Sequence, residues 1–193
     1  MWCSRKSVNK AYSNESIAPQ QRINQFKNLI RKSFLIKSLD MANTFSQLHV
    51  QVVFTVKYRN ALIESAFKER LYQYMTGILQ NYGHKVLAIN GTHDHVHILM
   101  SFRPTQSLSD CMEILKGEAS EWINRQKLLP NKFAWQKGYG GFTYTNSHVT
   151  RVIKYIENQE EYHKKVTFLE EFKQMLDGLE ISYEERFLFH EPL

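Results

Sequence analysis

The 193-residue chain is 42% hydrophobic and 13% aromatic, which is typical of a globular protein and excludes a disordered one. Its two cysteines exclude a disulfide framework and a cysteine-based zinc site, and no apolar run is long enough to span a membrane, so we expect a reduced, cytoplasmic protein with no membrane partner. The net charge of +6 is unevenly distributed along the chain, so it does not indicate a basic surface on the folded part.

The first 40 residues form a basic extension. They contain eight Lys or Arg and two acidic residues, whereas the 17 basic and 17 acidic residues of the remainder cancel. Residues 1–22 are rich in Ser, Asn and Gln, and residues 23–39 have the spacing of a basic amphipathic helix. We therefore predict a non-core extension over 1–40, either dispensable or an arm that grips DNA, followed by one folded domain over 41–193.

Apolar patterns predict the first four elements of this domain. Apolar residues at every second position indicate a strand over 48–57, which should be half-buried because its other face carries mostly polar residues. Apolar residues at helical spacing indicate a helix over 64–80. Two more segments, 85–90 and 95–102, are predicted as strands.

The second half of the domain begins with a helix that Ser107 can cap, because an acidic residue follows three positions later. A strand is predicted over 141–145, after a glycine-rich stretch, and Asn146 or Ser147 can cap the helix that follows it. A second capping-box pattern opens a final helix over 168–176.

This order of elements predicts the α+β fold class. Up to the fourth strand it is β-α-β-β-α-β, the ferredoxin-like arrangement of an antiparallel sheet with helices on one face. A tyrosine-bearing helix and a further helix follow at the C-terminal end. The polar faces of the first and third strands should then form one open floor.

The segment THDHVHILM, residues 92–100, places three histidines at every second position. His93, His95 and His97 should therefore share the polar face of the third strand, with the intervening apolar residues on the opposite face. A single histidine on a strand is most often structural. Two neutral imidazoles that point the same way can share a metal ion, so this motif is a candidate metal site.

Three classes of enzyme use histidines at this spacing. The amidohydrolases need an eight-stranded barrel, for which the chain is too short. The histidine-triad nucleotide hydrolases require an apolar residue where this chain has Asp94, and their motif lies near the chain end. The third class, the His-hydrophobic-His (HUH) nucleases, cuts single-stranded DNA with a tyrosine, so it requires a partner motif downstream.

Tyr155 and Gln159 form a suitable partner motif. They lie four residues apart, on one face of the predicted helix. The tyrosine can attack phosphorus, and the glutamine amide oxygen can complete a metal site with the histidines. A tyrosine on a helix is more often a partly buried packing residue than a nucleophile. Tyr155 is a candidate nucleophile because the HVH motif occurs in the same chain.

The stretch from Met41 to about Phe189 resembles the single-tyrosine (HUH-type) transposases of small bacterial insertion sequences and their REP-associated relatives. The segments that carry the resemblance are VKYR at 56–59, DHVHILM at 94–100, LKGEAS at 115–120, WQKGYGGF at 135–142 and YIENQ at 155–159. Together these segments are highly specific, whereas the HVH triplet alone would be a weak signal.

The resemblance implies metal ligands at His95, His97 and Gln159, which suit Mg²⁺ or Mn²⁺ without excluding zinc, and a catalytic nucleophile at Tyr155. It implies a DNA transposase that nicks and rejoins single-stranded DNA through a 5′-phosphotyrosine, acting on hairpin-forming element ends. It also implies a homodimer in which one chain's HVH can combine with the tyrosine helix of the other. The alternatives are a domesticated regulator that binds DNA hairpins and a nucleotide hydrolase of the histidine-triad type.

Two departures from the family pattern bear on these predictions. His93 stands where a non-ligand residue is expected, so an extra imidazole could crowd the metal. Tyr162 with Lys165 forms the tyrosine-x-x-lysine pattern of rolling-circle replication nucleases. We favour Tyr155, because only it has a ligand-type residue one helical turn further on.

DNA would be held by phosphate contacts from a local basic patch. The candidate residues for these contacts are Lys57, Arg59 and Lys116.

Overall fold

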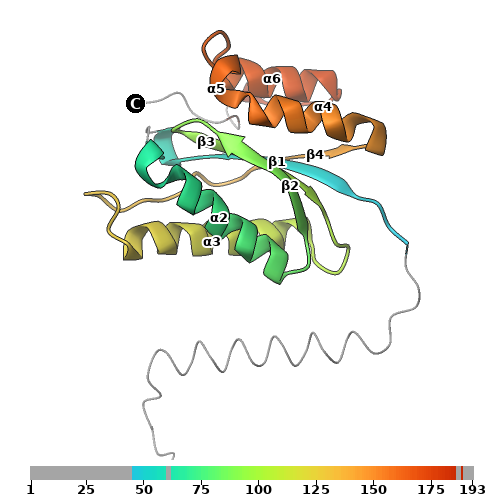
Figure 1. Ribbon diagram of the computed structural model, residues 1–193. Helices are drawn as coiled ribbons and strands as arrows, with labels where there is room; N and C mark the ends of the chain where they lie inside the picture. Colours follow the sequence, from blue (N-terminus) through green and yellow to red (C-terminus); the bar gives the residue numbers. More distant parts are fainter. Residues whose placement is uncertain (1–44, 60–61, 186–187, 189–193) are drawn as a thin grey trace, which may run out of the picture. The chain divides into compact units, whose positions relative to one another are not determined.

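Figure 1 shows the computed structural model of the protein, which describes residues 45–59, 62–185 and 188. The extension predicted over 1–40 lies outside these residues. The elements are β1 (His49–Thr55), η1 (Lys57–Arg59), α2 (Ser65–Asn81), β2 (Lys85–Gly91), β3 (His95–Ser101), α3 (Leu108–Arg125), β4 (Gly140–Tyr144), α4 (Asn146–Glu157), α5 (Gln159–Tyr162) and α6 (Phe168–Gly178). None of the described helices is both long and apolar enough to cross a membrane.

The four strands form one antiparallel sheet in the order β2-β3-β1-β4. This order, with α2 and α3 connecting the strands, is the ferredoxin-like arrangement, so the predicted α+β fold class is confirmed. The pairing of β1 with β3 places Val53 opposite His97 and Thr55 opposite His95. The two central strands therefore carry the HVH motif at the middle of the sheet.

One face of the sheet packs against α2 and α3, which lie together below it in Figure 1. The apolar residues that alternate along β1 and β3 point to this side and meet the apolar stripes of the two helices. The fully buried members of this core include Val52, Phe54, Val96, Ile98, Leu71, Met75 and Leu115.

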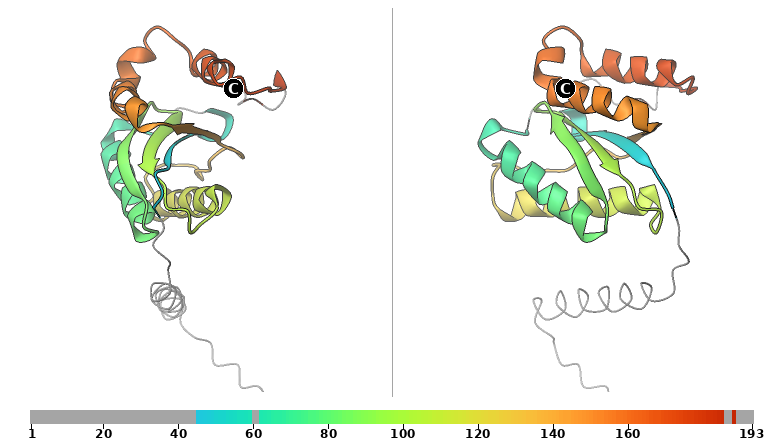
Figure 2. Two further views of the ribbon diagram at one scale, coloured as in Figure 1. Left: turned by 90° about the vertical axis from the view of Figure 1, so that its right-hand side faces the viewer. Right: turned by 45° about the vertical axis from the view of Figure 1, so that its right-hand side comes forward.

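The opposite face is covered by α4, α5 and α6, as both views of Figure 2 show. Val53 packs with Phe168 and Phe172 of α6, and Leu99 packs with Ile156 of α4. Every residue of β1 is buried as a result. The predictions of an open polar floor and of a half-buried first strand are therefore wrong, because the C-terminal helices have apolar stripes of their own that bury this face.

Two of the three predicted helix starts, those of α3 and α6, are confirmed. The hydroxyl of Ser107 accepts a 3.1 Å hydrogen bond from the Asp110 amide at the start of α3, and a complete capping box opens α6. The residue before α4, however, is Thr145 rather than Asn146 or Ser147. Its hydroxyl contacts the Ser147 side chain instead of a backbone amide of the helix.

The helix predicted to carry both Tyr155 and Gln159 is interrupted. Helix α4 ends at Glu157, and Asn158 has φ −94° and ψ 18° before α5 begins at Gln159. The side-chain amide of Asn158 donates to the carbonyl of Lys154 at 2.7 Å, beside the backbone bond to the same oxygen. Asparagine side chains compete with regular helical bonding in this way, so a kink at this position has a local cause.

Gly91 brings β2 and the HVH strand into very close approach. A Cβ atom on Gly91 would lie 2.1 Å from the carbonyl oxygen of His95 and 2.9 Å from the Cα of Val96. Both neighbours are backbone atoms that cannot turn away. We expect Gly91→Ala to lower the free energy of unfolding by about 1–3 kcal/mol, as overpacking does, when measured by urea denaturation.

Gly117→Ala is the matched control for this prediction. Gly117 lies inside α3, and an added Cβ would meet no described atom within 4 Å. Its substitution should stabilise the protein by up to about 1 kcal/mol, because alanine favours the helix. A Gly91→Ala protein as stable as wild type would contradict the close approach of the two strands.

Candidate metal and nucleophile site

His95 and His97 lie on the face of β3 that α4, α5 and α6 cover, and both side chains are completely buried. His93 precedes the strand and is exposed. The structure therefore brings together two of the three histidines that were predicted to share a face. The third has no place in the cluster, because the chain turns between β2 and β3 before the strand pairing begins.

The Nδ1 side of the His95 ring is fixed by hydrogen bonds with two residues that precede it, Thr92 and Asp94. Its Nδ1 lies 2.7 Å from Oδ1 of Asp94 and 3.0 Å from the hydroxyl of Thr92, which itself donates to Asp94 at 2.7 Å. Burial lowers the pKa of His95 to about 4, so the ring is neutral at pH 7. With Nδ1 protonated toward Asp94, Nε2 carries a lone pair that faces into the site.

The Nδ1 side of the His97 ring contacts Gln51 of β1, whose amide nitrogen lies 2.9 Å from Nδ1. The Gln51 oxygen and Nε2 of His97 are both buried with no hydrogen-bond partner among the described residues. Turning the amide by 180° would let its oxygen accept from Nδ1–H and leave Nε2 with a free lone pair. His97 Nε2 then faces the same space as His95 Nε2.

Tyr155 and Gln159 reach this space from α4 and α5 of the same chain. The Gln159 side chain is fully buried, and its Oε1 lies 3.3 Å from His95 Nε2. The Tyr155 ring stands edge-on to the His97 ring, with 5.8 Å between centroids. The four residues predicted from the sequence to form a site thus meet in one buried cluster within one chain.

Glu171 of α6 lies at the centre of this cluster and was missed by the sequence analysis. It is 1% exposed, and its Oε1 accepts hydrogen bonds from the Tyr155 hydroxyl and, at 2.9 Å, from the Gln159 amide. Burial alone would raise the pKa of Glu171, but its contacts with His163, His97 and Tyr155 outweigh burial and hold the pKa well below its usual range. The residue is therefore an ionised carboxylate.

The same carboxylate affects the tyrosine. Burial raises the pKa of Tyr155 above its usual value, and the negative charge of Glu171 raises it further. Tyr155 is therefore a neutral phenol whose proton is directed at Glu171. A signal for Glu171 did exist in the sequence: it occupies a position on the apolar stripe of α6, beside the buried Phe168 and Phe172.

His163, just after α5, is the second residue that was missed. Its Nδ1 donates to the carbonyl of Val166 at 2.9 Å, and its Nε2 lies 3.0 Å from Oε1 of Gln159 and 3.2 Å from Oε2 of Glu171. The side chains of His95, His97, His163 and Glu171 place one ligand atom each within 4.8 Å of the others. Imidazole and carboxylate groups are ligands of divalent metals, so the residues fit a metal ion.

Tyr162, the alternative nucleophile, points elsewhere. Its ring centroid is 5.5 Å from that of Tyr155, but its hydroxyl donates to Oε1 of Gln174 at 3.1 Å on a partly exposed surface. The structure therefore directs only the Tyr155 hydroxyl toward the cluster.

The residues predicted at DNA phosphates have different surroundings. Lys57 is exposed beside the ring of Tyr58, 4.9 Å from its centroid. The Arg59 side chain lies outside the described part of the chain. Lys116 donates to the carbonyls of Gln136 and Gly138 at 2.7 and 2.6 Å, so its ammonium group is occupied within the chain.

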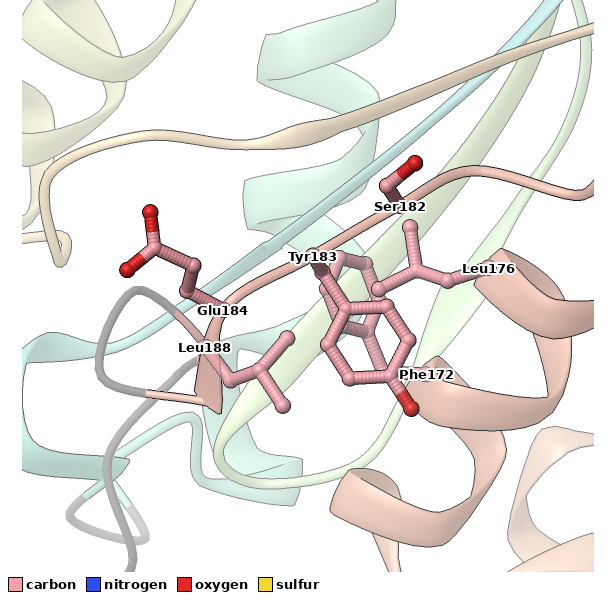
Figure 3. A pocket seen from close by; sticks show the side chains of 6 residues that line it. All are labelled: Phe172, Leu176, Ser182, Tyr183, Glu184 and Leu188. Atoms are coloured by element: carbon pink, nitrogen blue, oxygen red, sulfur yellow. The ribbon is translucent and has the colours of Figure 1, made fainter.

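A cavity of about 470 Å³ lies beside α6 and is shown in Figure 3. It is lined mainly by apolar and aromatic side chains: Phe172, Leu176, Ser182, Tyr183, Glu184 and Leu188. None of the predicted site residues lines this cavity, and it contains no histidine. The cavity is therefore separate from the buried cluster that contains Tyr155, His95, His97 and Gln159.

Known proteins resemble this chain over the region that contains the fold and most of the cluster. The sequence pattern of the family described as "Transposase IS200 like" matches residues 44–159. The ISDra2 transposase TnpA of Deinococcus radiodurans is 26% identical over 121 residues, which cover 60% of this chain and 86% of that protein.

Two solved structures share the fold. A putative transposase from Deinococcus radiodurans R1 has a TM-score of 0.51 at 21% identity, covering 62% of this chain and 96% of that one. A REP-associated tyrosine transposase bound to a REP hairpin has a TM-score of 0.50 at 12% identity, covering 66% and 75%. His163 and Glu171 lie beyond the segment that the family pattern matches.

Proposed function

Because the chain belongs to the family of IS200-like transposases, we propose that it nicks and rejoins single-stranded DNA through a 5′-phosphotyrosine formed at Tyr155. The observation that supports this most directly is the convergence of Tyr155, His95, His97 and Gln159 in one buried cluster. Transposases of this family cleave and transfer DNA strands, and the cluster contains a nucleophile and ligand-type groups for that chemistry.

In the proposed reaction the Tyr155 oxygen forms a bond to the scissile phosphorus as the bond from phosphorus to the 3′ oxygen of the upstream strand breaks. The proton that the phenol loses passes by way of Glu171 to this leaving oxygen, which becomes a 3′-hydroxyl. One phosphate ester bond replaces another, so rejoining by the reverse attack requires no ATP. The phenol proton is already directed at Oε1 of Glu171, which is placed to accept it. A Mg²⁺ or Mn²⁺ ion held by His95, His97 and Gln159 would supply Lewis-acid stabilisation of the phosphate charge.

The partners we propose are single-stranded DNA with hairpin-forming ends, met in the cytoplasm, and a second copy of this chain. The solved relative bound to a REP hairpin supports the hairpin substrate. Residues 1–40 would add electrostatic, sequence-independent affinity for DNA. We propose that the active site assembles within one chain, because Tyr155 lies beside the HVH motif of its own β3.

The proposal is tested by incubating the full chain with single strands that contain candidate element ends, in Mg²⁺ or Mn²⁺. A 3′-labelled strand should appear on a denaturing gel as a slowly migrating protein adduct. A 5′-labelled strand should appear as a shortened product that a polymerase can extend from its free 3′-hydroxyl. Tight hairpin binding with no adduct would instead identify a domesticated regulator, and nucleotide hydrolysis without DNA cleavage a histidine-triad type of hydrolase.

A further inference from the structure

The carboxylate of Glu171 presents two unlike oxygens to the cluster. Oε1 already accepts hydrogen bonds from the Tyr155 hydroxyl and the Gln159 amide. Oε2 is buried and accepts no hydrogen bond from the described residues, although it lies 3.3 Å from Nε2 of His97. That nitrogen is also buried without a hydrogen-bond partner in the described structure. A buried oxygen and a buried nitrogen, both unpartnered and this close, are placed like two ligands of one cation.

His163 shows the same arrangement from the other side. Its Nδ1 donates to the Val166 carbonyl, so a neutral His163 carries a lone pair on Nε2. That lone pair faces two acceptor atoms, Oε1 of Gln159 at 3.0 Å and Oε2 of Glu171 at 3.2 Å. Acceptors that face one another in a buried space need a positive centre between them, which is either a proton on the ring or a metal ion.

The Gln159 amide is turned toward this space by Glu171. Because its nitrogen donates to Oε1 of Glu171, its oxygen must face Nε2 of His95 at 3.3 Å and Nε2 of His163. Three imidazole nitrogens and one carboxylate oxygen therefore lie within 4.8 Å of one another, and the Gln159 amide oxygen lies within 3.3 Å of two of these nitrogens. Distances of about 3 Å between neighbouring ligand atoms are those expected around a divalent ion with bonds of about 2.0–2.2 Å.

We propose that Glu171, through Oε2, and His163, through Nε2, are metal ligands, and that the resulting three-imidazole, one-carboxylate site selects Mn²⁺ or Zn²⁺ over Mg²⁺. The inference rests on the proposed function for the ligands His95, His97 and Gln159. It adds Glu171 and His163, which lie outside the residues 44–159 that the family pattern matches. Imidazole binds transition metals in preference to Mg²⁺, which prefers oxygen ligands and keeps several waters. A third imidazole ligand strengthens this preference for a transition metal over Mg²⁺.

The test is calorimetric titration of the full, metal-free protein with Mn²⁺. Glu171→Gln and His163→Ala should each weaken Mn²⁺ binding at least ~10-fold, since even residues that only support a ligand change metal affinity about 10- to 100-fold. Glu170→Gln is the matched control on the same helix, because glutamine preserves the capping box, and His148→Ala is the control for an exposed histidine. Both controls should bind Mn²⁺ like wild type, and millimolar Mg²⁺ should not displace the bound ion.

The outcomes separate this inference from the proposed function. If His95→Asn weakens Mn²⁺ binding but Glu171→Gln and His163→Ala do not, a proton rather than the metal lies between those two groups, and the inference is overturned while the HVH site stands. If none of the variants changes Mn²⁺ binding, both fail. Pulsed electron paramagnetic resonance of the wild-type Mn²⁺ complex needs no variant: three coupled imidazole nitrogens support the inference, and two overturn it.

Discussion

Tyr155→Phe is expected to abolish the covalent protein–DNA adduct while leaving the fold and DNA binding intact. The substitution removes one oxygen and keeps the ring, which still packs edge-on against the rings of His97 and Tyr162. The lost hydrogen bond to the ionised Glu171 should cost about 1.5–3 kcal/mol of stability, and the carboxylate keeps its bond from Gln159. Adduct formation, measured on a denaturing gel with a 3′-labelled strand, should fall to background.

Tyr162→Phe is the matched control, because it removes the same atom from a neighbouring ring. The Tyr162 hydroxyl donates to Gln174 at a partly exposed surface, so its loss should leave most of the cleavage activity. Peptide mapping should find the phosphotyrosine at Tyr155. A modified Tyr162 would contradict the assignment and would indicate the replication-nuclease type of chemistry.

Removing either histidine of the HVH motif is expected to abolish metal-dependent cleavage and to weaken Mn²⁺ binding by at least an order of magnitude. An open polar face would have allowed alanine at these positions with little loss of stability. Since both rings are fully buried and held from behind by Asp94 and Gln51, alanine would leave a cavity and an unpaired polar group, at a cost of about 2–4 kcal/mol.

His95→Asn and His97→Asn are the sharper variants for that reason. The asparagine amide can keep the hydrogen bond that Nδ1 makes and removes only the Nε2 ligand. Cleavage is measured with a labelled single strand in Mg²⁺ and in Mn²⁺, and folding by circular dichroism. His93→Ala serves as the control, because this exposed histidine two residues before His95 contributes no atom to the cluster. Near-normal cleavage by a folded His95→Asn or His97→Asn protein would refute the metal assignment.

The buried position of the site has a consequence for substrate access. His95 and His97 are 0% exposed beneath α4, α5 and α6, and Gln159 at the start of α5 is equally buried, so these side chains are shielded from a DNA phosphate in the described structure. The kink at Asn158 separates α4 from α5 on the side of α4 that leads to Gln159.

Local sequence patterns determined much of the protein by themselves. The alternation of polar and apolar residues around His95 and His97 was enough to predict β3 and to place the histidines on the face opposite Val96 and Ile98, because strand geometry sends neighbouring side chains to opposite faces. The order of periodic segments was likewise enough to predict the ferredoxin-like sheet. The spacing of Tyr155 and Gln159 indicated a second group of site residues, since four residues make about one helical turn.

Only the tertiary structure decided how these groups meet. The sequence did not show that α6 covers the HVH face, because an apolar stripe specifies that a helix is buried without specifying what it is buried against. The position of Glu171 on the apolar stripe of α6 therefore indicated that it is buried, but not that it lies among Tyr155, Gln159 and His97. His163 was hidden for the same reason: a side chain becomes a ligand through what faces it across the fold, and that contact spans residues far apart in the chain.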